Sequence, residues 1–133
     1  MKYIVLLFLL TLEYSAKEYA IVSSVKMQKL SKAQVRAIFL KKLVQLENTK
    51  LVPVNLSYND SLRTLFEEEI LNIGKNRLQS YWIKQHYLGQ RPPVTMKSQK
   101  AALQFVKNVD GAVAYVEMKY IDSSCNVIYK WND

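Results

Sequence analysis

Four polar residues that follow a short apolar segment could together hold a small anion. The segment Leu51–Asn55 is typical of a strand, and within a few positions it is followed by Ser57, Asp60, Ser61 and Arg63. Where a strand turns into a helix, the first backbone N–H groups of the helix point outward without partners. Hydroxyl groups and an arginine beside them favour an oxyanion. This turn is therefore the first candidate for a ligand site.

The same residues also have a purely structural interpretation. Asp60, with Ser61 beside it, can cap the helix and stabilise it by about 1 kcal/mol. Arg63 can form an ion pair with Glu67, one helical turn later, instead of contacting an anion. As a cap, the Asp60 carboxylate would oppose an anion within about 4 Å by several kcal/mol at an effective dielectric near 20. Capping and anion binding compete at this turn, and the sequence leaves both open.

Other polar and aromatic residues are weaker candidates for the same pocket. Ser23 and Ser24 follow a predicted first strand, and Arg91 precedes a Pro-Pro pair that holds the chain extended. Tyr81 and Trp82 are more typical of core than of recognition residues. The sequence therefore predicts an anion pocket built from Ser61, Arg63, Asp60, Ser57, Ser24 and Ser23.

An alternation of strands and helices must position these residues. Strand patterns cover residues 19–23, 51–55 and 112–116, and residues 126–131 favour an edge strand. Ser31 with Gln34 forms a capping box, Ser98 can cap a later helix, and Gly89 is a C-cap of the helix before it. In the helix after Ser61 an apolar stripe includes Phe66, and Glu67 and Glu68 are expected to turn away from it.

Helices between strands imply crossover connections and a mainly parallel sheet. The predicted fold is α/β, a single-lobe, three-layer open sheet with helices on both faces. In such sheets ligands bind outside the carboxyl ends of the strands, where the Asn55–Ser61 turn is expected to lie. The fold pattern and the residue pattern thus indicate the same place.

Length and charge limit the classes of function. The chain has 133 residues, half of them hydrophobic, which suits one compact domain. Nineteen Lys and Arg residues against eleven Asp and Glu residues give a net charge of +8, which favours an acidic partner. Part of this excess lies at Lys26, Lys29, Lys32, Arg36, Lys41, Lys42 and Lys50. These residues predict the alternative function, an interaction or sensor module that docks on a protein or membrane partner without binding a ligand.

The N-terminus is typical of an export signal. Met1-Lys2 supplies a positive start, Ile4–Leu12 is apolar but too short to span a bilayer, and cleavage is expected after Ala16. The predicted organisation is a signal peptide over residues 1–16 and one domain over residues 17–133, located in the periplasm. A membrane anchor or a first core strand is the rival interpretation of the apolar run.

Catalysis, metal binding and nucleic-acid binding are not expected. The sequence has no Gly-x-Gly-x-x-Gly, Walker loop, nucleophile elbow or metal-ligand spacing. Cys125 is the only cysteine and His86 the only histidine, and no motif links the two. Basic and aromatic residues are not interleaved on one strand face, and the export signal argues against nucleic acid. No enzyme activity, cofactor or metal is predicted.

Several motifs in order resemble the phosphate-binding proteins of ABC transporters. They are Ile38-Phe39-Leu40 after a capped helix, Val52-Pro-Val-Asn55, Asp60-Ser61, and Gly111-Ala-Val-Ala-Tyr115-Val-Glu117 with Tyr120. The chain is more closely similar to short, single-domain exported relatives of those proteins. The resemblance implies a type II periplasmic-binding-protein fold, no catalysis, and phosphate or a similar oxyanion as ligand. It also implies an ABC transporter membrane component or another envelope protein as partner.

The sequence departs from this family at the site itself. Full-length relatives carry an arginine and then a Gly-Ser-Gly-Thr turn, and alignment on the following helix puts Leu56 at the arginine, with Asp60, Ser61 and Leu62 at the turn. A shift by one residue places Ser61 on the family's serine instead, and Arg63 could replace the lost charge.

The family closes two lobes around its ligand, so tight capture by this one lobe would need a partner chain or a homodimer.

Overall fold

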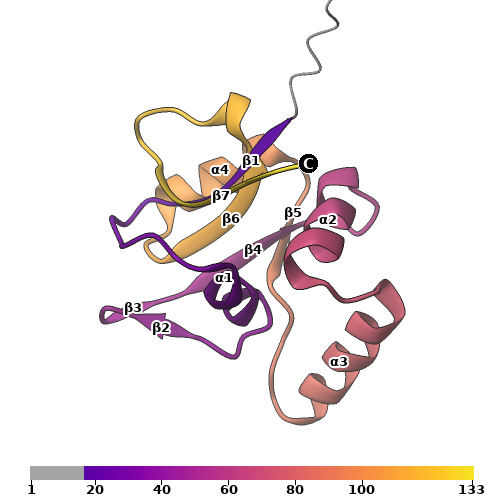
Figure 1. The fold of residues 1–133 in the computed structure, drawn as a ribbon. Coiled ribbons are helices and arrows are strands. Elements are labelled where there is room, and N and C mark those ends of the chain that lie inside the picture. The colour runs from indigo at the N-terminus through magenta and orange to yellow at the C-terminus, as the bar shows by residue number, and fades with distance from the viewer. Residues whose placement is uncertain (1–16) are drawn as a thin grey trace, which may run out of the picture.

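The computed structural model describes residues 17–133, so the predicted signal peptide, residues 1–16, lies outside the described part. Five strands form one sheet (Figure 1), in the order β5 (Val94–Met96), β4 (Val52–Leu56), β6 (Ala112–Glu117), β1 (Glu18–Ser23) and β7 (Asn126–Asn132). A separate hairpin joins β2 (Gln45–Leu46) to β3 (Thr49–Lys50). The expected strands are thus all present, within a residue or two of the predicted bounds.

Strand β1 runs against its neighbours. β4 is parallel to both β5 and β6, whereas β1 is antiparallel to β6 and to β7. The prediction of a mostly parallel sheet is confirmed, with β1 as the exception. The register pairs Ser23 with Val113, and Val113 with Pro53, so β1 ends at the edge of the sheet where β4 begins.

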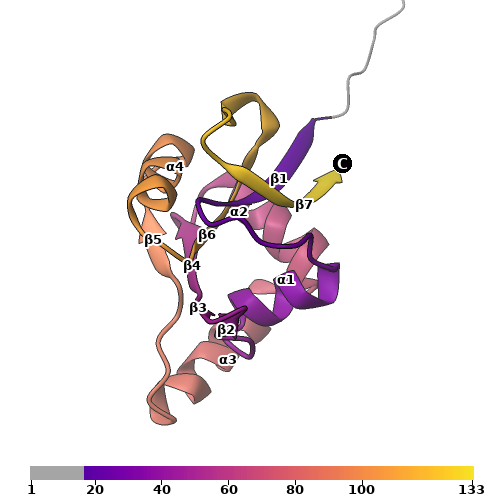
Figure 2. The ribbon, with the colours of Figure 1, turned by 90° about the vertical axis from the view of Figure 1, so that its left-hand side faces the viewer.

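Helices cover both faces of the sheet, as the sequence predicts. α4 (Gln99–Asn108) packs mainly against β6, and α1 (Lys32–Phe39) and α2 (Ser61–Phe66) lie on the other face. Figure 2 shows α4 and α1 on opposite sides of the strands, which confirms the three-layer α/β architecture. α3 (Lys75–Tyr87) instead extends away from the sheet at one end of the molecule (Figure 1).

Local side-chain signals set the ends of three helices. The Gln34 N–H donates to Ser31 Oγ at 3.2 Å, and the Ser31 N–H donates to Gln34 Oε1 at 2.9 Å, which is the predicted capping box. Ser98 Oγ accepts from the Ala101 N–H at 3.0 Å. Gly89, with φ of 83°, follows the end of α3 in the left-handed conformation that favours glycine.

Within residues 17–133, no helix is both long and apolar enough to cross a membrane.

Three aromatic rings join the helices of one face to the sheet. The Phe66 ring of α2 stacks on the Tyr115 ring of β6, with centroids 4.1 Å apart. The Phe39 ring of α1 meets Phe66 edge-on at 4.7 Å. All three side chains are buried, and this geometry adds about 0.5–1.5 kcal/mol per pair beyond area burial. The cluster fixes the position of α2 over the sheet, and therefore the position of the turn that precedes it.

The prediction that Glu67 turns away from the core is wrong. After Phe66 the helix widens into a π-helical turn, η1 (Glu67–Leu71), whose period is longer than 3.6 residues. The faces predicted from an α-helical period therefore no longer apply beyond Phe66. Glu67 is only 3% exposed, whereas Glu68 is exposed as expected. A buried carboxylate requires partners, and these lie at the candidate site.

Candidate anion-binding site

The end of β4 is held by the side chain of Tyr115. The Tyr115 hydroxyl accepts from the Leu56 N–H at 3.0 Å and donates to Asn55 Oδ1. Burial raises the pKa of Tyr115 well above the ordinary value of a tyrosine, so the phenol keeps the proton that it donates. The turn that follows Leu56 therefore starts from a fixed strand end at the carboxyl edge of the parallel strands.

Asp60 caps α2, as one of the two interpretations of the sequence expects. Its Oδ1 accepts from the Leu62 N–H at 2.9 Å, and its own N–H donates to the Ser57 carbonyl at 2.9 Å. Ser61 is exposed and Ser57 is half-buried beside it. A carboxylate thus occupies one of the outward N–H groups that an anion would use, and its charge opposes an anion at this helix start.

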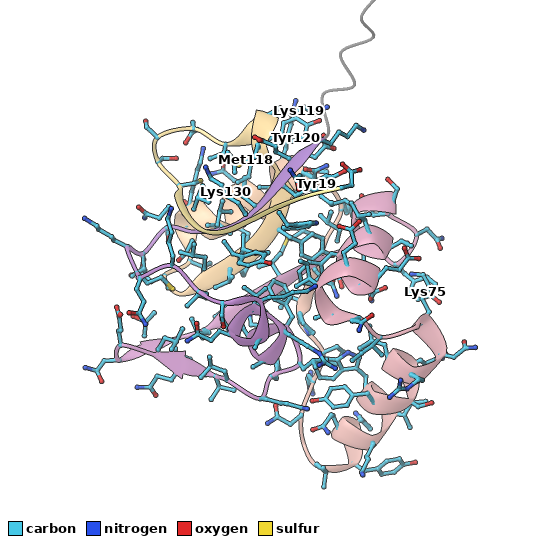
Figure 3. The ribbon with its side chains drawn as sticks, in the orientation of Figure 1. Tyr19, Lys75, Met118, Lys119, Tyr120 and Lys130 are labelled. Carbon is cyan, nitrogen blue, oxygen red and sulfur yellow. The ribbon has the colours of Figure 1, made fainter. Side chains whose placement is uncertain are left out.

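Arg63 and Lys75 converge on the buried carboxylate of Glu67. Arg63 Nε lies 3.2 Å from Glu67 Oε2, and Lys75 Nζ lies 3.2 Å from Glu67 Oε1. Arg63 Nη1 also donates to the Leu56 carbonyl at 3.0 Å, which ties the cation to the end of β4. Figure 3 shows Lys75 where α3 begins beside α2. Two cations and one anion leave this group with a net charge of +1.

The ring of Tyr58 lies against the two cations. Lys75 Nζ is 4.4 Å from the ring centroid and Arg63 Cζ is 5.5 Å from it, both within the range of cation–π attraction. Lys75 Nζ also lies 3.4 Å from the Tyr58 carbonyl oxygen. Two of the five N–H donors of Arg63 are used by Glu67 and Leu56. The remaining donors can meet a further acceptor.

A groove of about 530 Å³ adjoins these cations. It runs along one face of α3, because its helical members recur at spacings of three and four residues. Its lining residues are Tyr58, Arg63, Glu67, Lys75, Leu78, Gln79, Trp82, Ile83, His86, Tyr87 and Pro92. The groove is therefore charged at the start of α3 and mostly apolar farther along it.

The structure brings some predicted site residues together and separates others. Ser57, Asp60, Ser61 and Arg63 lie in or directly after the β4–α2 turn. Ser23 and Ser24 lie at the opposite edge of the sheet, because β1 is antiparallel to β6. Ser23 is fully buried, and its Oγ accepts from the Val25 N–H at 3.2 Å. These two serines therefore do not meet the turn.

Arg91, the sequence's other candidate, also stays outside the groove. Its side chain is exposed, and only the neighbouring Pro92 lines the groove. Tyr81 donates to the Leu40 carbonyl at 2.6 Å, which supports the core interpretation, whereas Trp82 lines the groove. Among residues 17–133, no three His, Cys, Asp or Glu side chains gather closely enough to hold a metal ion.

Tyr58 and Lys75 belong to the site but are not among the residues that the sequence indicates, whereas the ion pair of Arg63 with Glu67 is the structural alternative that the sequence leaves open. One sequence signal could have drawn attention to Lys75, which begins a stretch from Lys75 to Val109 without a single Asp or Glu. That stretch contains Lys75, Arg77, Lys84, Arg91, Lys97, Lys100 and Lys107. Its charge indicates an anionic neighbour more strongly than the net charge of the whole chain does.

The sequence matches no protein-family model and no curated protein. Solved structures do resemble it. A phosphate ABC transporter substrate-binding protein of Clostridium perfringens, solved with bound phosphate, is 16% identical, with a TM-score of 0.69 over 85% of this chain and 45% of its own. The chain shares the fold of that protein.

Two further structures agree with this assignment. An ABC-type phosphate transport receptor of Vibrio cholerae is 15% identical, with a TM-score of 0.66, and covers 84% of this chain and 45% of its own. PstS of Borrelia burgdorferi is 12% identical, with a TM-score of 0.65, and covers 85% of this chain and 47% of its own. The chain thus spans less than half the length of each of these proteins. At such low identity the likeness establishes the fold, and the resemblance expected from the sequence is confirmed at that level.

Proposed function

We propose that this chain is an exported, non-catalytic solute-binding domain that holds phosphate or a similar small oxyanion beside the β4–α2 turn. The observation that carries the proposal is the convergence of Arg63 and Lys75 on Glu67 beneath the Tyr58 ring. This group carries one net positive charge at the carboxyl edge of the parallel strands, where open sheets of this class bind ligands. Support also comes from the shared fold, since one of the similar proteins was solved with bound phosphate.

The site differs from the one that the sequence alone indicates. Arg63 and the Ser61 hydroxyl remain its expected members, and Lys75 and Tyr58 join them. Asp60 acts against the anion, because its carboxylate already accepts from the Leu62 N–H. Glu67 also competes, since it pairs with both cations. We expect weak, reversible binding of a bare oxyanion rather than tight capture.

Isothermal titration of the chain with phosphate and then sulfate tests the proposal. Saturable binding is expected at low salt, and it should persist at physiological ionic strength because Arg63 is only 16% exposed. The double variant Ser61→Ala, Arg63→Ala should lose this binding. The matched control Lys84→Ala removes an exposed cation of α3 that does not line the groove, and it should bind like the original chain.

Replacement of Glu67 gives a result in the opposite direction. Glu67→Gln frees both cations and should tighten phosphate binding by roughly tenfold, which is about 1.4 kcal/mol. This gain is smaller than the repulsion of about 4 kcal/mol between two unit negative charges about 4 Å apart at an effective dielectric of about 20. It should also lower the free energy of unfolding by about 1–3 kcal/mol, because charge-assisted hydrogen bonds to a buried group are lost. Affinity that is unchanged in Glu67→Gln and in the double variant would contradict the proposed site.

A docking module is the second candidate, favoured by the basic residues between β1 and the end of β3. Lys26, Lys29, Lys32, Arg36, Lys42 and Lys50 are all exposed, and none forms an ion pair with a described residue. Burial, with nearby Lys50 as a smaller cause, lowers the pKa of Lys41, the half-buried member of the set. A titration heat that disappears as salt rises would favour this surface over the anion site.

A further inference from the structure

The groove along α3 is larger and more apolar than a bare oxyanion requires. Its volume of about 530 Å³ lies in the range of small-molecule pockets, roughly 300–1,000 Å³. Phosphate beside Arg63 and Lys75 would fill only the charged end. The remainder lies between Leu78, Trp82 and Pro92, whose side chains offer no charge to a ligand.

The two ends of the groove differ in chemistry. At the start of α3, Lys75 and Arg63 outnumber Glu67 and leave one net positive charge. Farther along the helix, Trp82 and Ile83 form an apolar wall about two turns beyond Lys75. Within the lining, Glu67 is the only acidic residue, and both of its oxygens are paired. A cation therefore has no acceptor carboxylate to meet, whereas an anion has donors at one end.

Apolar side chains of the groove remain in contact with water. Ile83 is 55% exposed and Tyr87 is 85% exposed, on a helix of which only Leu78 is buried. Exposed apolar surface beside a polar rim is typical of a binding site, because a ligand that covers it releases water from both partners. The occupant must therefore bring its own apolar surface.

We propose that the groove binds an organic anion with an apolar body. Its negatively charged head, a carboxylate, sulfonate or phosphate monoester, meets Lys75 and Arg63, and its aromatic or aliphatic body lies against Trp82 and Ile83. This inference rests on the proposed function, since the head occupies the same cationic end as the bare oxyanion. It adds that the apolar wall of α3 selects among anions.

Three probes that share parts of one structure test the inference by isothermal titration of the full chain. Sulfate carries the head alone, 2-naphthalenemethanol carries the body alone, and 2-naphthalenesulfonate carries both. The sulfonate should bind at least about tenfold more tightly than either of the other two. Over sulfate this gain corresponds to roughly 55 Å² of buried apolar surface, and over the alcohol it comes from the charged head that meets Lys75 and Arg63. Equal affinity of the sulfonate and sulfate, or of the sulfonate and the alcohol, would overturn the inference.

Two variants of exposed residues, one on α3 and one directly after it, locate the site. Ile83→Ser removes part of the apolar wall and should weaken the sulfonate by about fivefold while leaving sulfate unchanged. The matched control Leu88→Ser alters a 69% exposed residue that does not line the groove, so both affinities should stay as they were. A sulfonate affinity that Ile83→Ser leaves unchanged would place the probe elsewhere and contradict the inference.

The same titrations separate this inference from the proposed function. If sulfate and phosphate bind but the sulfonate gains nothing, the oxyanion site stands and the role of the groove is wrong. If the sulfonate binds with the expected dependence on Ile83 while neither inorganic anion binds, the groove stands and the oxyanion function is wrong. Loss of sulfonate binding in Lys75→Ala would then confirm that the head meets the charged end.

Discussion

The sheet and helix α3 differ in how firmly the rest of the protein holds them. Five of the six residues of β6 are no more than 1% exposed, and its Tyr115 touches two helices and the neighbouring strand. Of the thirteen residues of α3, only Leu78 is buried, and Ile83 and Tyr87 near its end face water. The candidate site lies at the border between the two. One of its cations, Arg63, is tied to the strand end, whereas the other, Lys75, begins the loosely held helix.

This contrast indicates a division of roles. The buried region positions Arg63, because Tyr115 fixes Leu56 and the Leu56 carbonyl accepts from the guanidinium. The α3 region supplies the exposed surface that a ligand can cover. Substitutions in the sheet should therefore act on stability first, and substitutions in α3 should act on binding with little effect on stability.

Gly111→Ala should have the largest effect of the changes considered. Gly111 has φ of 83°, and a Cβ at this position would overlap the Lys50 carbonyl oxygen. Strain and overlap together should lower the free energy of unfolding by at least about 3 kcal/mol. The midpoint of thermal unfolding should then fall by about 10 °C or more.

Gly74→Ala is the matched control at the start of α3. Its φ is −66°, and no heavy atom lies within 4 Å of a Cβ built there. The change should therefore shift the free energy of unfolding by less than about 1 kcal/mol. Equal destabilisation by the two glycine substitutions would contradict the difference drawn between the sheet and α3.

Tyr115→Phe should have the next largest effect. The variant keeps the stacked ring but leaves Asn55 Oδ1 without its donor and the Leu56 N–H without its acceptor. Unsatisfied buried groups should cost about 1–3 kcal/mol, measured by denaturant unfolding with an unchanged m-value. The binding of phosphate should weaken as well, because Arg63 loses a fixed strand end.

Tyr81→Phe is the control that sharpens this comparison. The Tyr81 hydroxyl donates to the Leu40 carbonyl at 2.6 Å. The side chain is only half-buried, so in the variant a water molecule can donate to this carbonyl instead. We expect a loss of about 0.5–1.5 kcal/mol and no change in anion binding. If Tyr81→Phe lowered the free energy of unfolding as much as Tyr115→Phe does, α3 would be held as firmly as the sheet.

Local sequence signals predict much of this fold because they act within a few residues. The capping box of Ser31, the cap at Ser98 and the Asp60 cap each need only neighbours in the chain, and all three are present. The direction of β1 depends instead on its pairing with β6 and β7, far away in sequence. The sequence places Ser23 at the end of the first strand, but local patterns do not show that this end lies at the opposite edge from the β4–α2 turn.

The candidate site was predicted only in part for a similar reason. The turn and Arg63 follow from the strand-to-helix pattern, but Lys75 reaches Glu67 only because the start of α3 lies near α2. The burial of Glu67 depends on the π-helical turn, which an α-helical period does not predict. The groove arises where Tyr58, Arg63 and Pro92 meet α3, so no single segment of sequence encodes it.

At neutral pH the smallest effect should come from tyrosine ionisation, because the loss of stability that it causes is confined to pH values above about 10. Burial raises the pKa of Tyr19 to about 12, with the Asp133 carboxylate that its hydroxyl meets at 3.1 Å as a smaller cause. Burial also raises the pKa of Tyr115. A tyrosine whose pKa is higher in the folded state favours folding fully below its unfolded pKa, near 10, and this contribution is lost as pH rises through the folded pKa. The free energy of unfolding, measured by urea titration at pH 9, 10 and 11, should therefore stay level at first and then fall.

Two tyrosine variants decide whether the sheet causes this fall. Tyr115→Phe removes one ionisable group from the core, so the decline above pH 10 should become shallower, although the variant starts from a lower stability. Tyr87→Phe changes an 85% exposed residue at the end of α3, and its decline should match that of the original chain. If Tyr87→Phe flattens the decline and Tyr115→Phe does not, alkaline sensitivity belongs to α3. The stability of the strand end that positions Arg63 would then not depend on the protonated hydroxyl of Tyr115.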